Sequence, residues 1–143
     1  MNIEEQDQWG TDFDWFCVDD AGEIGHFTTA GFKLLPKSVS SSAEDLKLVT
    51  DYFEKEAPVR CAHLIDGDFK GNLRDFLAMA DRGLYSFDIE TYGTTYSRVA
   101  RPEVPLRLID LPKPIREIVG RTIMRERVLK DSSRVAYEET LEI

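Results

Sequence analysis

The chain has 143 residues, of which 42% are hydrophobic and 31% charged, which predicts one folded domain over 1–143 and excludes a disordered chain. Its apolar runs are far shorter than the roughly 20 residues of a membrane-spanning helix, so we expect no membrane span. The formal net charge of −9 disfavours non-specific binding to nucleic acid, which requires clustered positive charge.

The first strong structural signal is a predicted β-hairpin over 14–28. Residues 1–11 are mostly polar, and we expect them to be a loosely ordered N-terminal segment. Two apolar and β-branched runs then flank Asp19-Asp20-Ala21-Gly22, where Gly22 can take the positive φ of a tight turn. Trp15 and Phe27 lie in these runs, so we expect the helices to pack on this hairpin.

Two helices are predicted in the middle of the chain, over about 43–56 and 72–82. Ser42 and Asn72 are suited to cap them. Between them, 59–65 is a candidate strand and 66–68 a turn. The helical spacing predicts two sets of buried side chains: Leu46, Val49 and Phe53 in the first helix, and Leu73, Phe76, Leu77 and Ala80 in the second.

The second half of the chain predicts further strands. Residues 84–90 alternate between apolar and polar, and 96–100 resume an extended pattern after a turn, which indicates a second hairpin. We expect a short edge strand over 106–109, a short helix that ends at Gly120 and a last strand over about 135–140, whereas 121–129 fits a strand or a helix. The fold class is therefore α+β, with a mostly antiparallel sheet and two main helices packed on one face.

Four residues could in principle bind zinc: Cys17, His26, Cys61 and His63. They lack the short Cys-x-x-Cys or His-x-x-x-His spacings of zinc sites, so we expect no metal and no cofactor. The simpler interpretation is that the cysteines are reduced, buried side chains. Together with an acidic start that differs from the basic start of a secretory signal, this favours a cytoplasmic protein.

Charge is distributed unevenly along the chain. Residues 1–32 contain eight acidic side chains and no Lys or Arg, whereas 98–130 contain nine basic and four acidic side chains. This pattern favours a basic protein partner, although negative charge also simply keeps a protein in solution. Carboxylate pairs of the kind used by hydrolases are also present, but turn formation explains those beside glycines.

A partner-binding surface is the most specific functional hypothesis. Two carboxylates on the expected outer face of a strand run into a loop with two tyrosines, and tyrosine is favoured at protein interfaces. The alternative is an ordinary exposed strand whose tyrosines cover the sheet. The candidate contact residues, which include the turn of the first hairpin, are Asp88, Glu90, Tyr92, Tyr96, Asp19 and Asp20.

Three stretches carry a family resemblance: DWFCVDDAGEIGHFT (14–28), GLYSFD (83–88) and YSRVARPEVPL (96–106). They resemble small uncharacterised bacterial α+β proteins, which are similar to immunity proteins of bacterial toxin systems. The resemblance implies a single-domain cytoplasmic protein that binds and blocks a cognate toxin. It assigns no catalytic residue to this chain. The predicted function is therefore protein binding without catalysis, and a basic toxin domain is a partner that fits this prediction. The alternative is a small enzyme or ligand-binding domain that uses the acidic loops.

Overall fold

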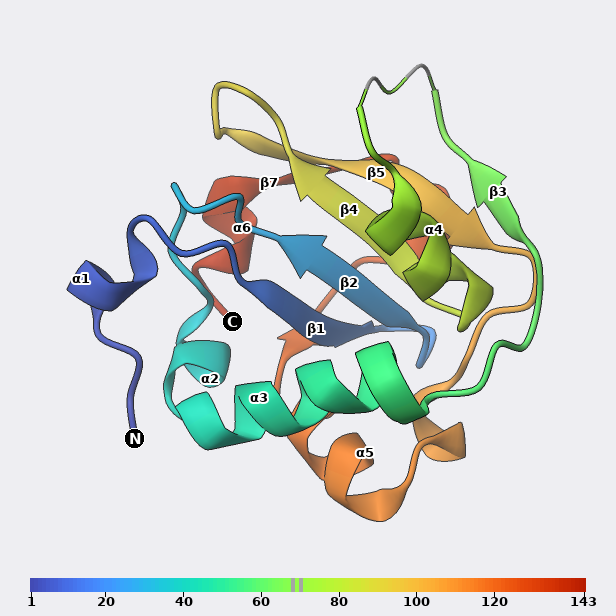
Figure 1. Cartoon of the computed structure of the whole chain (residues 1–143), viewed down its shortest axis with the longest axis horizontal. Helices are drawn as coiled ribbons and strands as arrows, with labels where there is room; N and C mark the ends of the chain where they lie inside the picture. The colour runs from blue at the N-terminus through green and yellow to red at the C-terminus, as the bar shows by residue number, and fades with distance from the viewer. Residues whose placement is uncertain (68, 70) are drawn as a thin grey trace.

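A single mixed β-sheet forms the centre of the molecule in the computed structural model, which describes residues 1–67, 69 and 71–143 (Figure 1). Its strands run in the order β3–β5–β4–β2–β1–β6, and β7 pairs with β5. The strands are β1 (Asp14–Asp19), β2 (Ile24–Thr28), β3 (His63–Ile65), β4 (Tyr85–Ile89), β5 (Thr95–Pro102), β6 (Ile123–Met124) and β7 (Arg134–Ala136).

Helices cover both faces and the ends of this sheet. The described α-helices are α1 (Glu5–Gln8), α2 (Lys37–Ser40), α3 (Ala43–Asp51), α4 (Arg74–Asp81), α5 (Lys113–Val119) and α6 (Tyr137–Thr140). A π-helical turn, η1 (Tyr52–Glu56), continues α3, and the short 3-10 turns are η2 (Leu108–Asp110) and η3 (Leu129–Asp131). The expected α+β class is confirmed.

The predicted hairpin over 14–28 is confirmed as β1 and β2. Their antiparallel register pairs Asp14 with Thr28 and Val18 with Ile24. In the turn, Oδ1 of Asp19 accepts hydrogen bonds from the backbone N–H groups of Ala21 and Glu23, both at 2.9 Å. Gly22 has a φ of +76°, a left-handed conformation that favours glycine.

The expectation of a mostly antiparallel sheet is wrong, because the sheet is mixed. β2 runs parallel to β4, and β1 runs parallel to β6. The chain leaves β2, passes through α2, α3, β3 and α4, and returns beside β2 in the same direction. Periodicity along the sequence identifies the strands, but it carries no information about such long crossovers.

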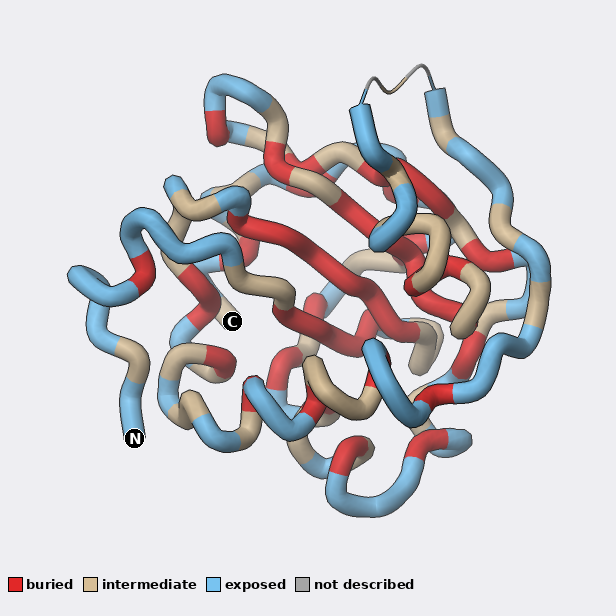
Figure 2. Tube along the Cα trace, viewed as in Figure 1, coloured by how far each residue is buried: buried red, intermediate tan, exposed pale blue. Residues whose placement is uncertain are grey.

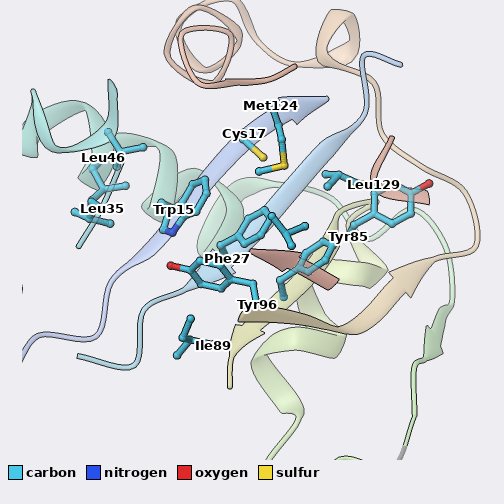
Figure 3. Close-up of a cluster of buried hydrophobic side chains, with 13 residues drawn as sticks. Trp15, Cys17, Phe27, Leu35, Leu46, Tyr85, Ile89, Tyr96, Met124 and Leu129 are labelled. Carbon is cyan, nitrogen blue, oxygen red and sulfur yellow. The ribbon is translucent and has the colours of Figure 1, made fainter. Parts of the chain in front are cut away.

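Stacked aromatic rings form the core on one face of the sheet (Figure 3). Trp15, Phe27 and Phe87 lie side by side on β1, β2 and β4, with ring centroids 4.4 and 4.5 Å apart, and Tyr96 meets the first two edge-on. All four side chains are fully buried. Figure 2 shows the same pattern, with buried residues running along the central strands.

The opposite face packs against helices. Phe16 of β1 and Ile24 of β2 belong to a second buried cluster with Phe53, Met79 and Ile115, which come from η1, α4 and α5. The two main helices expected on one face, α3 and α4, both contribute to this cluster, and α5 packs on the same face. In Figure 1, α3 lies along β1, and α4 lies over β4.

Both middle helices are present, with small differences from the prediction. The Ser42 hydroxyl accepts a hydrogen bond from the Asp45 backbone N–H at 3.2 Å, and the amide oxygen of Asn72 accepts one from Arg74 at 3.0 Å. Leu46, Val49 and Phe53 are buried as predicted. In the second helix Ala80 and Met79 are buried, whereas Leu73, Phe76 and Leu77 are only half-buried. That helix packs on β4 and β5, and its buried residues lie in its C-terminal half, whereas its first turn is partly exposed.

Three other predictions needed correction. The strand expected over 59–65 is limited to β3, and Asp68 of the predicted turn over 66–68 lies outside the described residues. Residues 106–109 form no edge strand: Arg107 makes an isolated bridge with Glu23, and η2 follows. The ambiguous stretch 121–129 contains β6, and the last strand ends at Ala136, where α6 begins. Residues 1–11, expected to be a loosely ordered segment, include α1, and the side-chain oxygen of Gln8 accepts a hydrogen bond from Leu35 N–H at 2.7 Å.

Candidate functional site

A groove lined with carboxylates lies between α3, α4 and the start of β1. Its volume is about 640 Å³, and the N-terminal segment forms one of its walls. We call it the acidic groove. Its basic side chains include Lys47, which pairs with Asp51 at 2.6 Å. Six carboxylates line the acidic groove: Asp7, Asp12, Asp14, Asp51, Glu54 and Asp75.

A smaller pocket of about 330 Å³ shares three of these carboxylates with the acidic groove, and we call it the inner pocket. Asp14, Glu54 and Asp75 come from β1, η1 and α4. Three separate segments of the chain therefore bring negative charge to one place. In the described part of the chain, no basic side chain lies within ion-pair distance of Glu54 or Asp75. The remaining lining residues are Phe53, Ala78, Met79 and Arg82.

A buried histidine lies directly behind Asp14. His26 of β2 has no solvent exposure, and its Nδ1 lies 2.7 Å from the Ser86 hydroxyl on β4. Its Nε2 lies 3.5 Å from Oδ2 of Asp14, which is close enough for electrostatic attraction but is not a hydrogen bond. The strand register explains this arrangement, because His26 and Ser86 are directly paired residues on adjacent strands.

Serine, histidine and aspartate in this order invite comparison with a hydrolase triad. Nucleophilic catalysis requires a serine hydroxyl that a substrate can reach. Ser86 is fully buried on a central strand, so its hydroxyl cannot attack a substrate in this structure. The geometry therefore supports a structural role for the Ser86 and His26 pair.

Asp12 extends the carboxylate cluster towards Asp88. The pKa of Asp12 lies above its ordinary value, first because neighbouring chain displaces water from its carboxyl, and then because Asp14 and Asp88 repel its charge. The Ala30 backbone N–H, which donates to Oδ1 of Asp12 at 2.9 Å, acts in the opposite direction, as does His26. Asp88 itself accepts a hydrogen bond from the Thr28 hydroxyl at 2.6 Å.

We expect Asp12→Asn to raise the melting temperature at neutral pH. Since folding raises the pKa of this acid, ionised Asp12 opposes folding above that pKa, and the cost disappears as pH falls below the ordinary value of 3.8. The amide oxygen of asparagine can still accept the bond from Ala30. Thermal melts of variant and parent should thus differ at neutral pH and converge in acid; a melting temperature at neutral pH below that of the parent would contradict this.

Asp19 and Asp20, two of the predicted contact residues, lie in different environments. Asp19 is buried at 4% exposure, and its Oδ2 accepts a hydrogen bond from Leu129 N–H at 2.8 Å, in addition to the two turn bonds on Oδ1. Asp20 is exposed, and its Oδ2 accepts a bond from Glu126 N–H at 2.8 Å. Asp19 therefore holds the hairpin turn and the start of η3 together, and it offers no free surface to a partner.

Asp19→Ala should lower the free energy of unfolding by about 1–3 kcal/mol, because it leaves buried backbone donors without an acceptor. Asp20→Ala is the matched control at the neighbouring exposed position, and we expect it to change stability by no more than about 0.5 kcal/mol. Urea titrations of the two variants provide the comparison. Equal stability of both variants would show that the bonds of Asp19 contribute little.

The predicted contact residues in the second hairpin also differ in their exposure to solvent. Tyr92 is 90% exposed at its tip, whereas Tyr96 is fully buried against Trp15 and Phe27. Glu90 is half-buried; it accepts hydrogen bonds from the Ser97 hydroxyl and from Nη2 of Arg134, the latter at 2.9 Å. The predicted outer face of β4 is also covered, since Ser86 is buried and Asp88 half-buried. The expected tyrosine and carboxylate surface is therefore reduced to Tyr92.

Sequence reasoning did not identify the acidic groove as a site. The sequence indicates only that the N-terminal region is acidic. Only the tertiary arrangement brings these carboxylates near Asp75. Of the predicted contact residues, Asp88 acts on the groove electrostatically, because its charge helps to raise the pKa of Asp12.

The four candidate zinc ligands do not converge on one point. Cys17 is paired with Gly25 in the β1–β2 register, so it points to the face opposite His26. Cys61 donates to the Ala80 carbonyl, and His63 lies 2.8 Å from the Asp81 carboxylate. Among the residues that the structure describes, no group of three or more His, Cys, Asp or Glu side chains could hold a metal ion.

No protein-family model, curated protein or solved structure matches the chain. Within the described ranges, no helix combines the length and the apolar character needed to cross a bilayer.

Proposed function

We propose that this protein binds a basic protein partner through the acidic groove and catalyses no reaction on it. In this proposal it acts in the cytoplasm as an immunity-type protein that neutralises a cognate toxin. The observation that carries the proposal is the gathering of six carboxylates from three chain segments around one groove. Such a surface attracts a positively charged partner and repels the phosphates of nucleic acids.

Two features of the groove favour binding of a macromolecule. Its carboxylates are spread over an open surface, and Glu54 and Asp75 are exposed side chains that a partner can reach directly. Charges at such a surface accelerate association with an oppositely charged protein, and salt weakens this effect. Both cysteines are free thiols, in keeping with a reducing compartment.

A small-ligand or enzymatic function is the second candidate. The groove volume of about 640 Å³ lies in the range of small-molecule sites, and Asp12 and Asp14 contribute carboxylates to its lining. What favours the protein partner is the lining, because pockets for small molecules are mostly apolar and this groove is rich in charge.

The test is affinity capture from a native lysate, followed by titration of the purified captured protein at low and at high salt. We expect one basic protein whose affinity falls as salt rises. A captured protein whose affinity ignores salt would contradict the electrostatic proposal. Turnover of a small substrate by the purified chain, without any captured protein, would favour the second candidate.

A further inference from the structure

The outer side of β3 is an open edge of the sheet. β3 stands at the end of the strand order and pairs with β5, at the right-hand margin of the sheet in Figure 1. The Asp66 N–H donates to the Val99 carbonyl on β5 at 2.9 Å, and bonds between antiparallel strands recur at every second residue. Leu64 therefore bonds to β5, whereas His63 and Ile65 direct their backbone groups towards the open edge.

The open edge carries four backbone groups, which are the N–H and C=O of His63 and of Ile65. Among the residues that the structure describes, none forms a hydrogen bond with any of these groups. Such an edge is a template for another strand, and soluble proteins commonly protect it with lysine or proline. β3 has the sequence His-Leu-Ile, which contains neither.

The side chains at the open edge are apolar as well as exposed. Leu64 and Ile65 are 45% and 50% exposed. Val59, shortly before β3 in the chain, and Val104, shortly after β5, are exposed too. A single exposed apolar side chain is ordinary, but several beside unpaired backbone groups indicate a surface that another protein chain covers.

The open edge is complementary to itself. In an antiparallel register centred on Leu64, His63 lies opposite Ile65 of a second copy, and each such pair exchanges two N–H···O=C bonds. All four open groups of each chain are then paired. Leu64 meets Leu64 of the second copy at the closely spaced position between these pairs, where side chains are in direct contact. β3 contains no acidic residue that would repel its own copy, so this match favours a second copy over a strand of a different protein.

We propose that two copies of this chain associate through antiparallel pairing of β3, which joins their sheets across a two-fold axis at Leu64. Because a strand of three residues buries little surface, the dimer is weak and forms at high protein concentration. The described lining of the acidic groove includes no residue of β3, so the dimer and the proposed basic partner use separate surfaces. The dimer does not depend on the proposed function.

Sedimentation velocity of the full chain, from about 10 µM to about 1 mM, covers the concentrations at which a weak dimer forms. We expect a reversible conversion of monomer to dimer over this range. Salt distinguishes the dimer from the complex with a basic partner. Two chains that each carry a net charge of −9 repel each other, so dimerisation should strengthen as salt rises, whereas binding of the basic partner should weaken.

A charge exchange at Leu64 tests the register. Leu64→Lys and Leu64→Glu each place two like charges opposite one another, and each should weaken dimerisation at least about tenfold. The backbone bonds to β5 are preserved, so both variants should have the circular dichroism spectrum of the parent. An equal mixture of the two variants should associate again, because lysine and glutamate then face each other at the axis.

Ile109→Lys is the matched control. It adds the same charge at an exposed apolar side chain on η2, which lies beside the turn of the first hairpin, away from β3. We expect dimerisation of this variant to equal that of the parent. Equal weakening by Ile109→Lys and Leu64→Lys would show that added charge acts without regard to position, and would contradict pairing through β3.

Three further results would overturn the proposal: a parent that remains monomeric at about 1 mM, a Leu64→Lys variant that dimerises as the parent does, or a mixture of the folded Leu64→Lys and Leu64→Glu variants that does not associate. Each leaves the proposed function standing if the captured partner still binds in a salt-dependent manner. Loss of the captured partner from Leu64→Lys would show that β3 receives a strand of that partner in place of a second copy. A dimer that responds to the variants as expected, with no partner captured, would count against the proposed function alone.

Discussion

Trp15→Ala is expected to lower the free energy of unfolding by about 3–5 kcal/mol, enough to unfold a marginally stable domain. Trp15 has no solvent exposure, and its ring stacks on Phe27 at 4.4 Å and meets Tyr96 edge-on at 6.0 Å. Alanine removes these contacts and leaves a cavity that the surrounding strands cannot close. Urea-induced unfolding, followed by circular dichroism, measures the loss.

The chain offers a matched control, because its second tryptophan is 52% exposed. Trp9→Ala deletes the same number of atoms at the end of α1, and we expect a change within about 0.5 kcal/mol. A loss of similar size in both variants would contradict the aromatic core as the principal source of stability.

Arg98→Met is expected to destabilise the protein by about 3–5 kcal/mol, because it removes the donor of two backbone carbonyls and leaves a partly buried carboxylate with only its more distant ion-pair partner, Arg101 at 3.5 Å. Nε of Arg98 donates to Asp66 at 2.8 Å, and Nη1 donates to the carbonyls of Leu129 and Lys130 at 2.7 and 2.8 Å. The side chain is 7% exposed and joins β5 to the loop before β7. Methionine preserves much of the packing volume and removes every one of these bonds.

Arg134→Met is the control for this variant. Its guanidinium pairs with Glu90 at 2.9 Å, but the side chain is 63% exposed, so we expect a loss below about 1 kcal/mol. Arg98→Lys tests geometry separately, since lysine retains the charge and lacks the planar fork. If Arg98→Met were as stable as Arg134→Met, the buried network would not contribute as described.

Local signals in the sequence were sufficient for most of the elements. The turn glycine Gly22 and the alternation in β4 located strands, and the Ser42 cap located α3, because these features depend on residues close in the sequence. The parallel pairs β2–β4 and β1–β6 depend on contacts across more than 50 residues, which periodicity does not encode.

The site was less predictable for the same reason. Tyr96 and Asp19 have residue types that are common at interfaces and in turns, and their burial follows from tertiary packing alone. The acidic groove combines β1, η1 and α4, and no spacing rule connects Asp14, Glu54 and Asp75. The excess of acidic residues at the start of the chain is the one sequence feature that points towards this groove.

The most direct test of the central claim is the affinity of the captured partner for the Glu54→Gln and Asp75→Asn double variant, measured at low and at high salt beside the parent. If the acidic groove binds a basic partner, the variant binds more weakly at low salt, and its affinity falls less steeply as salt rises. The Glu103→Gln and Glu138→Gln double variant, which removes the same charge from exposed positions outside the groove, should behave as the parent does. Equal affinities and equal salt dependence in the groove variant and the parent would contradict the claim.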